Sequence, residues 1–230
     1  MISLTTLIQG ESGSGKSWLG DTAPGPRLIL DAENGSQFTP SQPKVLWDPL
    51  KEYPPAAEGL ETVRVLVRDF TTVTTIFNWL NSGQHPFTSV VWDSLTEIQK
   101  RCLDQIVGLN QPKIQDWGEL LRNMERLVRD FRDLTMHPIK PLQNVTFITT
   151  TLIDDTGVRR PNIQGALRLT LPQFVDVVGF LEVKQAQDGS LVRGLMTQPY
   201  PGYVAKDRTG KLGGYVWNPN IQQMMEVING

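Results

Sequence analysis

The sequence predicts an α/β protein with a mainly parallel, twisted sheet flanked by helices and a C-terminal β-hairpin. Short apolar runs rich in β-branched residues recur along the chain, and segments with helical periodicity separate them. This alternation favours parallel strands joined by helical crossovers. Functional groups gather where parallel strands end. We therefore expect the residues that end four of the strands to converge at one edge of the sheet: Gly10, Glu33, Asp93 and Thr150.

The first part of the chain supplies five predicted strands and one longer helix. The strand before the glycine-rich loop is followed by a brief helix, because Pro24 and Pro26 stop it. Residues 36–61 contain five prolines and are predicted to be irregular apart from one short strand. The predicted strands are 1–9, 27–33, 44–47, 62–67 and 87–93, and the helix is 71–83, ended by Gly83.

The second part alternates in the same way and then turns antiparallel. Apolar residues spaced i, i+3, i+4 and i+7 predict an amphipathic helix over 117–134, and residues 144–151 form the next predicted strand. A polar loop is expected from Asp154 to about Leu169. Two further strands, 175–183 and 190–198, are predicted to form a hairpin.

Composition limits the classes of protein that fit. A chain of 230 residues with 39% hydrophobic content is expected to form a single domain over residues 1–230. A net charge of −2 excludes a surface that is basic throughout, so nucleic-acid binding would depend on local clusters. The single cysteine, Cys102, lies in an apolar-periodic run, and there is no signal-peptide pattern or membrane-length apolar stretch. We expect a cytoplasmic protein without a membrane partner, in the host cytoplasm if the protein is viral.

The segment GESGSGKS carries the most specific motif. Gly10, Gly15, Lys16 and Ser17 match G-x-x-x-x-G-K-[ST], in which backbone N–H groups surround phosphate oxygens, the lysine reaches the β- and γ-phosphates and the hydroxyl binds Mg²⁺. The alternative is a flexible linker, but a strand is predicted before the segment and a helix after it. The predicted nucleotide-binding residues are Gly10, Glu11, Ser12, Gly13, Ser14, Gly15, Lys16, Ser17 and Trp18.

Two acidic residues at strand ends complete the predicted chemistry. Asp93 ends an apolar run, where a carboxylate would hold Mg²⁺ through its water shell. Glu33 ends a neighbouring run, where a carboxylate could orient the water that attacks the γ-phosphate. Spacing alone leaves a second interpretation open, in which Asp31 or Glu33 caps the following turn. Magnesium arriving with ATP is the only metal that we expect.

Four segments, GESGSGKS, LILDAE, SVVWDS and FITTT, resemble in order and spacing the ATPase core of the RecA/RadA recombinase superfamily. The chain is most similar to core-only phage RecA-like proteins grouped with the Sak-type single-strand annealing proteins. The resemblance implies a RecA-like P-loop core with DNA-stimulated ATP hydrolysis, in which Glu33 activates water and links nucleotide state to DNA affinity. It also places Thr150, or its neighbour Thr149, at the polar sensor position where RecA has a glutamine.

The resemblance further implies a DNA-binding loop within residues 154–173. Arg159, Arg160 and Arg168 lie there, and no acid occurs from Thr156 to Val175, which favours contacts with DNA phosphates. A solvated surface loop is the alternative. Lys113, in the loop before the amphipathic helix, is a second candidate for a phosphate contact.

Lys206 and Arg208 fall where RecA-type filaments send basic residues into the ATP site of the neighbouring subunit. A cation supplied in this way would stabilise charge on the γ-phosphate. The alternative is that the segment DRTG is a turn with incidental charge. The residues that contact adenine are left open: Phe38 could stack on the base or belong to the core or a loop.

The leading hypothesis is an ATP-dependent, single-stranded-DNA-binding recombinase or annealing protein that assembles head to tail as a filament or a ring. Its expected partners are single-stranded DNA, further copies of the chain and a single-stranded-DNA-binding protein. One alternative is an ATP-gated DNA-binding scaffold with negligible hydrolysis. Another is a P-loop NTPase of the kinase or packaging type.

Overall fold

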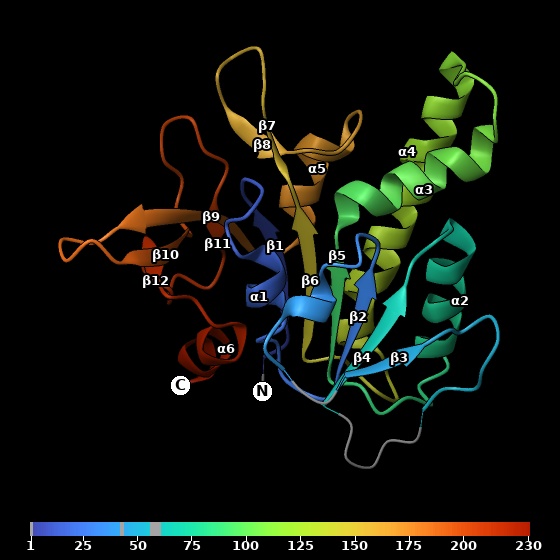
Figure 1. The fold of residues 1–230 in the computed structure, drawn as a ribbon, viewed down its shortest axis with the longest axis horizontal. Helices are drawn as coiled ribbons and strands as arrows, with labels where there is room; N and C mark the ends of the chain where they lie inside the picture. Colours follow the sequence, from blue (N-terminus) through green and yellow to red (C-terminus); the bar gives the residue numbers. More distant parts are fainter. Residues whose placement is uncertain (1, 42–43, 56–60) are drawn as a thin grey trace.

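The computed structural model describes residues 2–41, 44–55 and 61–230. Its centre is a sheet in the order β12-β10-β9-β1-β6-β5-β2-β4-β3, with β11 paired to β9 (Figure 1). From β9 to β3 all neighbouring strands are parallel. The bounds of these strands are β1 Leu4–Gln9, β2 Arg27–Asp31, β3 Lys44–Trp47, β4 Thr62–Leu66, β5 Ser89–Asp93, β6 Asn144–Thr149 and β9 Val177–Gln185.

The side of the sheet beyond β9 is antiparallel. β9 and β10 (Leu191–Met196) form the predicted hairpin, and β12 (Tyr215–Trp217) adds to its outer edge. The short β11 (Lys206–Asp207) pairs with the beginning of β9. The predicted fold class is thereby confirmed, including the C-terminal hairpin.

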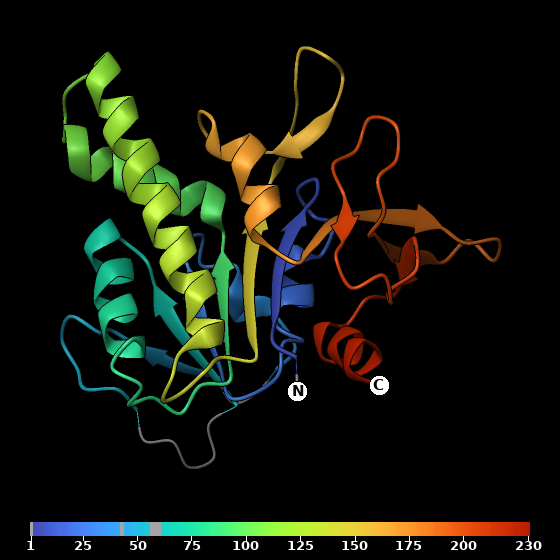
Figure 2. The ribbon, with the colours of Figure 1, turned by 180° about the vertical axis from the view of Figure 1, so that it is seen from behind.

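Helices cover both faces of the sheet because its strands bury side chains alternately on the two sides. In β2, Leu28 and Leu30 belong to one apolar cluster, whereas Ile29 belongs to the other. The first cluster is closed by α2 (Phe70–Leu80), α3 (Leu95–Val107), α4 (Ile114–Asp133) and α5 (Leu167–Phe174), and Figure 2 shows α4 in front of the sheet. The second is closed by α1 (Lys16–Gly20) and α6 (Ile221–Asn229).

Most of the predicted elements are present, and the corrections are local. The expected polar loop from Asp154 to Leu169 contains part of a two-stranded ribbon, β7 (Thr151–Ile153) with β8 (Arg159–Pro161), and the first turn of α5. β12 and α6 were not predicted. The irregular segment 36–61 holds β3 and two short 3₁₀ turns occur in the fold, η1 (Ser36–Phe38) and η2 (Leu134–Met136). Residues 42–43 and 56–60 of that segment lie outside the described residues.

The order of the strands brings the predicted site together. β6 lies between β1, which precedes the glycine-rich loop, and β5, which ends at Asp93. β2, which precedes Glu33, is the next strand beyond β5. All four strands run in the same direction, so their carboxyl ends meet at one edge of the sheet.

Candidate nucleotide-binding site

A pocket of about 410 Å³ lies at this edge of the sheet. Glu33, Asp93 and Thr150 line it together with the glycine-rich loop, which confirms that the predicted strand ends converge. Gly10 begins the loop and lies beneath it. The lining residues are Ser12, Gly13, Gly15, Lys16, Ser17, Trp18, Glu33, Gly35, Asp93, Ser94, Ile148, Thr150 and Arg193.

The loop requires glycine for two separate reasons. Gly13 and Gly15 have φ angles of 79° and 97°, in the left-handed region that favours glycine. Gly10 has no such angle, but a Cβ atom there would lie 2.4 Å from the carbonyl oxygen of Leu181 in β9. The loop joins β1 directly to α1, so it is a tight connection within the sheet and not a flexible linker.

Lys16 is folded back onto the loop. Its Nζ donates hydrogen bonds to the carbonyl oxygens of Gly10, at 3.0 Å, and Glu11, at 2.7 Å. Burial lowers the pKa of the Lys16 amine, and the nearby carboxylates of Asp93 and Glu33 partly offset this effect. The amine thus stands between the loop and the two acidic strand ends.

Asp93 is buried at the end of β5. Burial raises its pKa to about 7, and a hydrogen bond with the hydroxyl of Ser17 acts in the opposite direction. A hydroxyl and a carboxylate are oxygen ligands of the kind that Mg²⁺ prefers, either directly or through its water shell. Ser17 and Asp93 therefore fit the predicted Mg²⁺ site. Within the described ranges, no group of three or more His, Cys, Asp or Glu side chains could hold a metal by itself.

Asp31 and Glu33 have different roles, which decides between the two interpretations of this strand end. The carboxylate of Asp31 accepts hydrogen bonds from the backbone N–H groups of Glu33, Gly35 and Ser36, so Asp31 caps the turn. Glu33 lines the pocket, where its carboxylate accepts a hydrogen bond from the hydroxyl of Ser94. That hydroxyl ties Glu33 to the residue after Asp93.

Arg64 fastens the same turn from the neighbouring strand β4. Its Nη2 lies 2.9 Å from the Asp31 carboxylate and donates to Asn34 Oδ1 at 2.8 Å, while its Nε donates to Ser36 Oγ at 2.7 Å. The Asp31 side chain is fully buried and that of Arg64 is 10% exposed. The position of Glu33 therefore depends on a buried ion pair that the sequence motif does not contain.

Thr150, and not Thr149, faces the pocket. Thr149 is buried, and its hydroxyl has no hydrogen-bond partner among the described residues. The Thr150 N–H donates to Thr96 Oγ1 at 3.0 Å, and its hydroxyl accepts a hydrogen bond from Asn162 Nδ2 at 3.0 Å. Asn162 follows β8, so the pocket is joined directly to the β7–β8 ribbon.

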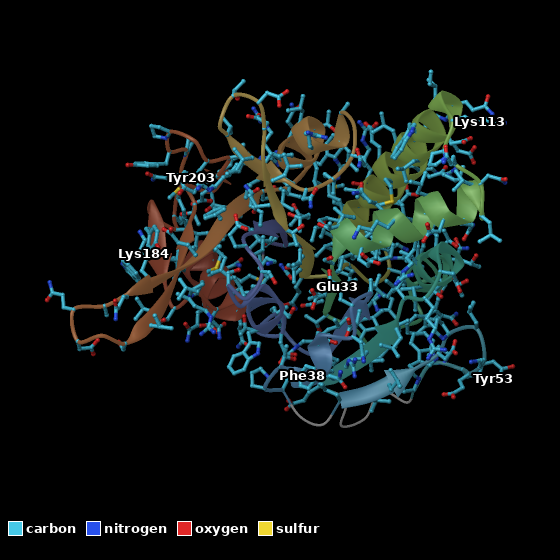
Figure 3. All side chains as sticks on the ribbon, turned by 45° about the horizontal axis from the view of Figure 1, so that its top comes forward. Glu33, Phe38, Tyr53, Lys113, Lys184 and Tyr203 are labelled. Carbon is cyan, nitrogen blue, oxygen red and sulfur yellow. The ribbon has the colours of Figure 1, made fainter. Side chains whose placement is uncertain are left out.

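The candidate DNA-binding arginines lie on or after that ribbon. The guanidinium of Arg159 lies 4.8 Å from the centre of the Tyr203 ring. The statement that these arginines are unpaired is wrong for Arg160, which forms an ion pair with Asp154, just before the acid-free window. Arg168, in α5, forms no ion pair within the described part of the chain. Lys113 lies at the far tip of the α3–α4 pair, away from Glu33 (Figure 3).

Lys206 and Arg208 are both bonded to the end of α5. Lys206 Nζ donates to the carbonyl oxygens of Pro172 and Val175, which satisfies groups at the helix terminus. Arg208 pairs with Asp176 at 2.7 Å and remains about half exposed. Each cation thus has partners within its own chain, and a role across a subunit interface stays a prediction.

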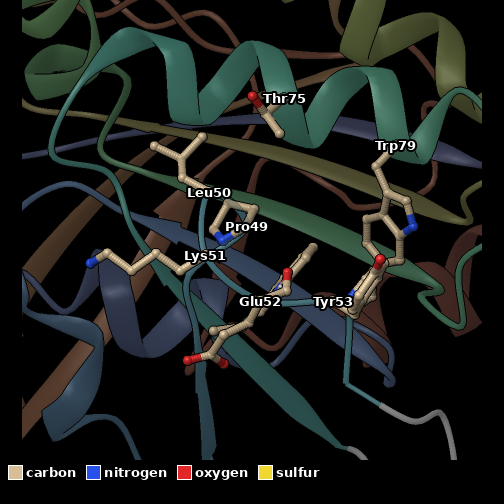
Figure 4. A pocket seen from close by; sticks show the side chains of 9 residues that line it. Pro49, Leu50, Lys51, Glu52, Tyr53, Thr75 and Trp79 are labelled. Atoms are coloured by element: carbon tan, nitrogen blue, oxygen red, sulfur yellow. Dashed lines mark hydrogen bonds between the residues drawn. The ribbon is translucent and has the colours of Figure 1, made fainter.

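Other candidate residues and hollows are separate from the pocket. Phe38 is 74% exposed and does not line the pocket, so no contact of Phe38 with a base follows from the structure. Arg193, from β10, was not predicted and lines it. A larger hollow of about 450 Å³ lies between the segment after β3 and α2, where Tyr53 and Trp79 contribute aromatic rings (Figure 4). None of the predicted site residues lines that hollow.

A family model described as an AAA domain matches residues 3–209 of the chain. No curated protein matches. Among solved structures, the chain is similar to an ATPase from the type III secretion system of pathogenic bacteria, with 14% sequence identity and a TM-score of 0.48. The match covers 78% of this chain and 52% of the other, so the chain spans about half the length of that ATPase. None of the described helices has both the length and the apolar character needed to cross a membrane.

Proposed function

The chain belongs to the AAA-domain family of P-loop ATPases, and from this premise we propose that it hydrolyses ATP with Glu33 as the general base and couples hydrolysis to single-stranded DNA. The observation that carries the hydrolytic part is the position of the Glu33 carboxylate. It lines the phosphate-loop pocket beside Lys16 and Asp93, on a turn that is fixed from below by Asp31 and Arg64.

In the proposed reaction, Glu33 accepts a proton from a water molecule as the water oxygen forms a bond to the γ-phosphorus. The bond from the γ-phosphorus to the bridging oxygen breaks, and ADP and phosphate leave. Lys16 offsets the negative charge on the phosphate oxygens, and Ser17 with Asp93 would hold the Mg²⁺ ion that bridges them. To do so, the Lys16 amine exchanges its bonds to the Gly10 and Glu11 carbonyls for bonds to phosphate.

The Asn162–Thr150 hydrogen bond supports coupling to DNA. It joins a residue of the pocket to the segment just after Arg159 and Arg160. Arg159 stacks on Tyr203, whose ring lies 6.0 Å from that of Tyr200, and Tyr200 is 60% exposed. A cation beside exposed aromatic rings suits a single strand, because bases can stack while the guanidinium meets phosphates.

We further propose that the protein acts in recombination or strand annealing and that copies assemble head to tail. The support is the resemblance of the motifs around Lys16, Glu33 and Asp93 to recombinase cores. In such an assembly, a contact between unlike surfaces gives a ring if it closes and a filament if it does not.

The test measures phosphate release and DNA affinity on the same preparations. The wild type is expected to release phosphate only with Mg²⁺ and to do so faster with single-stranded DNA. Arg159→Ala with Arg160→Ala should weaken DNA binding and lower its salt slope by about 2, roughly one per lost phosphate contact. Arg126→Ala, which removes an exposed arginine of α4, is the control. Unchanged DNA affinity and salt slope in the double variant would overturn the assignment of the DNA site.

A further inference from the structure

Arg193 reaches the phosphate loop from β10, a strand far from the loop in sequence. Its Nε donates a hydrogen bond to the carbonyl oxygen of Ser14 at 3.2 Å, and its guanidinium carbon lies 5.7 Å from the centre of the Trp18 ring. Within the described residues, Arg193 forms no ion pair with a carboxylate. Both Arg193 and Trp18 line the pocket, and the Trp18 side chain is about half exposed.

The order of the strands gives the pocket two distinct ends. Glu33 follows β2, on one side of the loop-bearing strand β1, whereas Arg193 lies in the hairpin on the other side. Asp93 follows β5 and Thr150 follows β6, and both strands lie on the Glu33 side. A nucleotide whose γ-phosphate faces these three residues therefore directs its nucleoside toward Trp18 and Arg193.

We propose that Trp18 and Arg193 form the base-binding end of the pocket. The base lies against the exposed indole ring and the planar guanidinium, which offer stacking and cation–π contacts. This proposal rests on the assignment of the pocket to ATP and adds the residues that hold the base. It also explains why Trp18, an aromatic residue directly after the motif, is left exposed beside an arginine without a carboxylate partner.

Stacking has a consequence for specificity. Each base has a π-face, so stacking tolerates different bases, and larger rings gain more contact area. Purine nucleotides are therefore expected to bind more tightly than pyrimidine nucleotides, with little difference between ATP and GTP.

Calorimetric titration of the wild type with ATP, GTP, CTP and magnesium tripolyphosphate tests the proposal. Trp18→Ala and Arg193→Ala should each weaken ATP binding by about tenfold or more, the scale of a lost stacking contact. Neither should change the affinity for tripolyphosphate, which has no base. Trp18→Phe keeps a ring and should restore most of the affinity. Trp217→Ala, which removes another half-exposed tryptophan on β12, is the matched control and should bind ATP as the wild type does.

The possible results are distinct. Unchanged ATP affinity in Trp18→Ala and Arg193→Ala overturns the base site while leaving the ATPase assignment intact. An equal loss of ATP and tripolyphosphate binding in Arg193→Ala overturns the role of Arg193 toward the base and makes it a phosphate ligand. A wild type that binds neither ATP nor tripolyphosphate overturns the proposed function and this inference together.

Discussion

Asp31 and Arg64 form a buried ion pair, with 2.9 Å between Oδ2 and Nη2, beneath the turn that carries Glu33. The same carboxylate accepts hydrogen bonds from the N–H groups of Glu33, Gly35 and Ser36. A motif residue at the end of β2 is thus held in place by a side chain from β4. The precision of the catalytic carboxylate depends on this pair as well as on the motif.

Arg64→Met should lower both stability and hydrolysis. The change leaves the Asp31 carboxylate buried without its cation, which costs about 3 kcal/mol or more in the free energy of unfolding. Urea unfolding and phosphate release measure the two effects. Adding Asp31→Asn removes the buried charge and should recover part of the stability, but hydrolysis should stay low because the turn is no longer capped. Full recovery of hydrolysis in the double variant would argue against a positioning role.

Gly10→Ala should destabilise the protein and weaken nucleotide binding. The added Cβ would lie 2.4 Å from the Leu181 carbonyl oxygen, so β9 and the loop must separate, at a cost of about 1–3 kcal/mol. Gly118→Ala, in the interior of α4 with nothing within 4 Å of the new Cβ, is the control and should stabilise the helix by about 1 kcal/mol. Thermal unfolding compares the two variants. Equal effects would show that the close approach of β9 does not constrain the loop.

Asp93→Asn should stabilise the nucleotide-free protein more at pH 8 than at pH 5. Because burial raises the folded-state pKa of Asp93 to about 7, the folded protein holds a proton between pH 4 and 7 that the unfolded chain has released. The free energy of unfolding therefore falls as pH rises through this window. The advantage of the variant should be about 2 kcal/mol larger at pH 8 than at pH 5, at 1.36 kcal/mol per pH unit.

Urea unfolding in EDTA, without nucleotide, measures this difference for Asp93→Asn. Asp130→Asn, at a partly exposed position on α4, serves as the control and should show no such pH dependence. An advantage of Asp93→Asn that is the same at both pH values would contradict a raised pKa at Asp93.

Mixing two inactive variants tests the role of Arg208 across a subunit interface. A Lys16→Ala subunit lacks the phosphate-binding amine but keeps Arg208, whereas an Arg208→Ala subunit has the reverse defect. If the cation acts in trans, some interfaces in the mixture are complete, and phosphate release should partly recover. Absence of recovery would leave Arg208 with its observed partner, Asp176, as its only role.

The sequence predicted the parts of the site that are contiguous in the chain. The glycine-rich loop, Glu33 and Asp93 each follow an apolar strand, and the parallel order of those strands brings them together. Arg64 and Arg193 could not be predicted in the same way, because their roles depend on which strands are neighbours. Arg64 reaches Asp31 only because β4 pairs with β2, and Arg193 reaches the loop only because the hairpin pairs with β1 through β9.

The error at Arg160 has a similar origin. An acid-free window that began at Thr156 omitted Asp154, and the β7–β8 ribbon folds that residue back onto Arg160. The capping role of Asp31 and the pocket-facing role of Glu33 were also inseparable in sequence. Only the direction of the two side chains after β2 distinguishes them.

Hydrolysis by Glu33→Gln is the most direct test of the central claim. The amide keeps the size of the side chain but cannot accept a proton from water, so phosphate release should fall by about 10²- to 10⁴-fold. The affinity for ATP, measured by calorimetry, should be retained, because Lys16 and the loop are unchanged. Unchanged phosphate release in Glu33→Gln, with ATP affinity intact, would contradict the assignment of Glu33 as the general base.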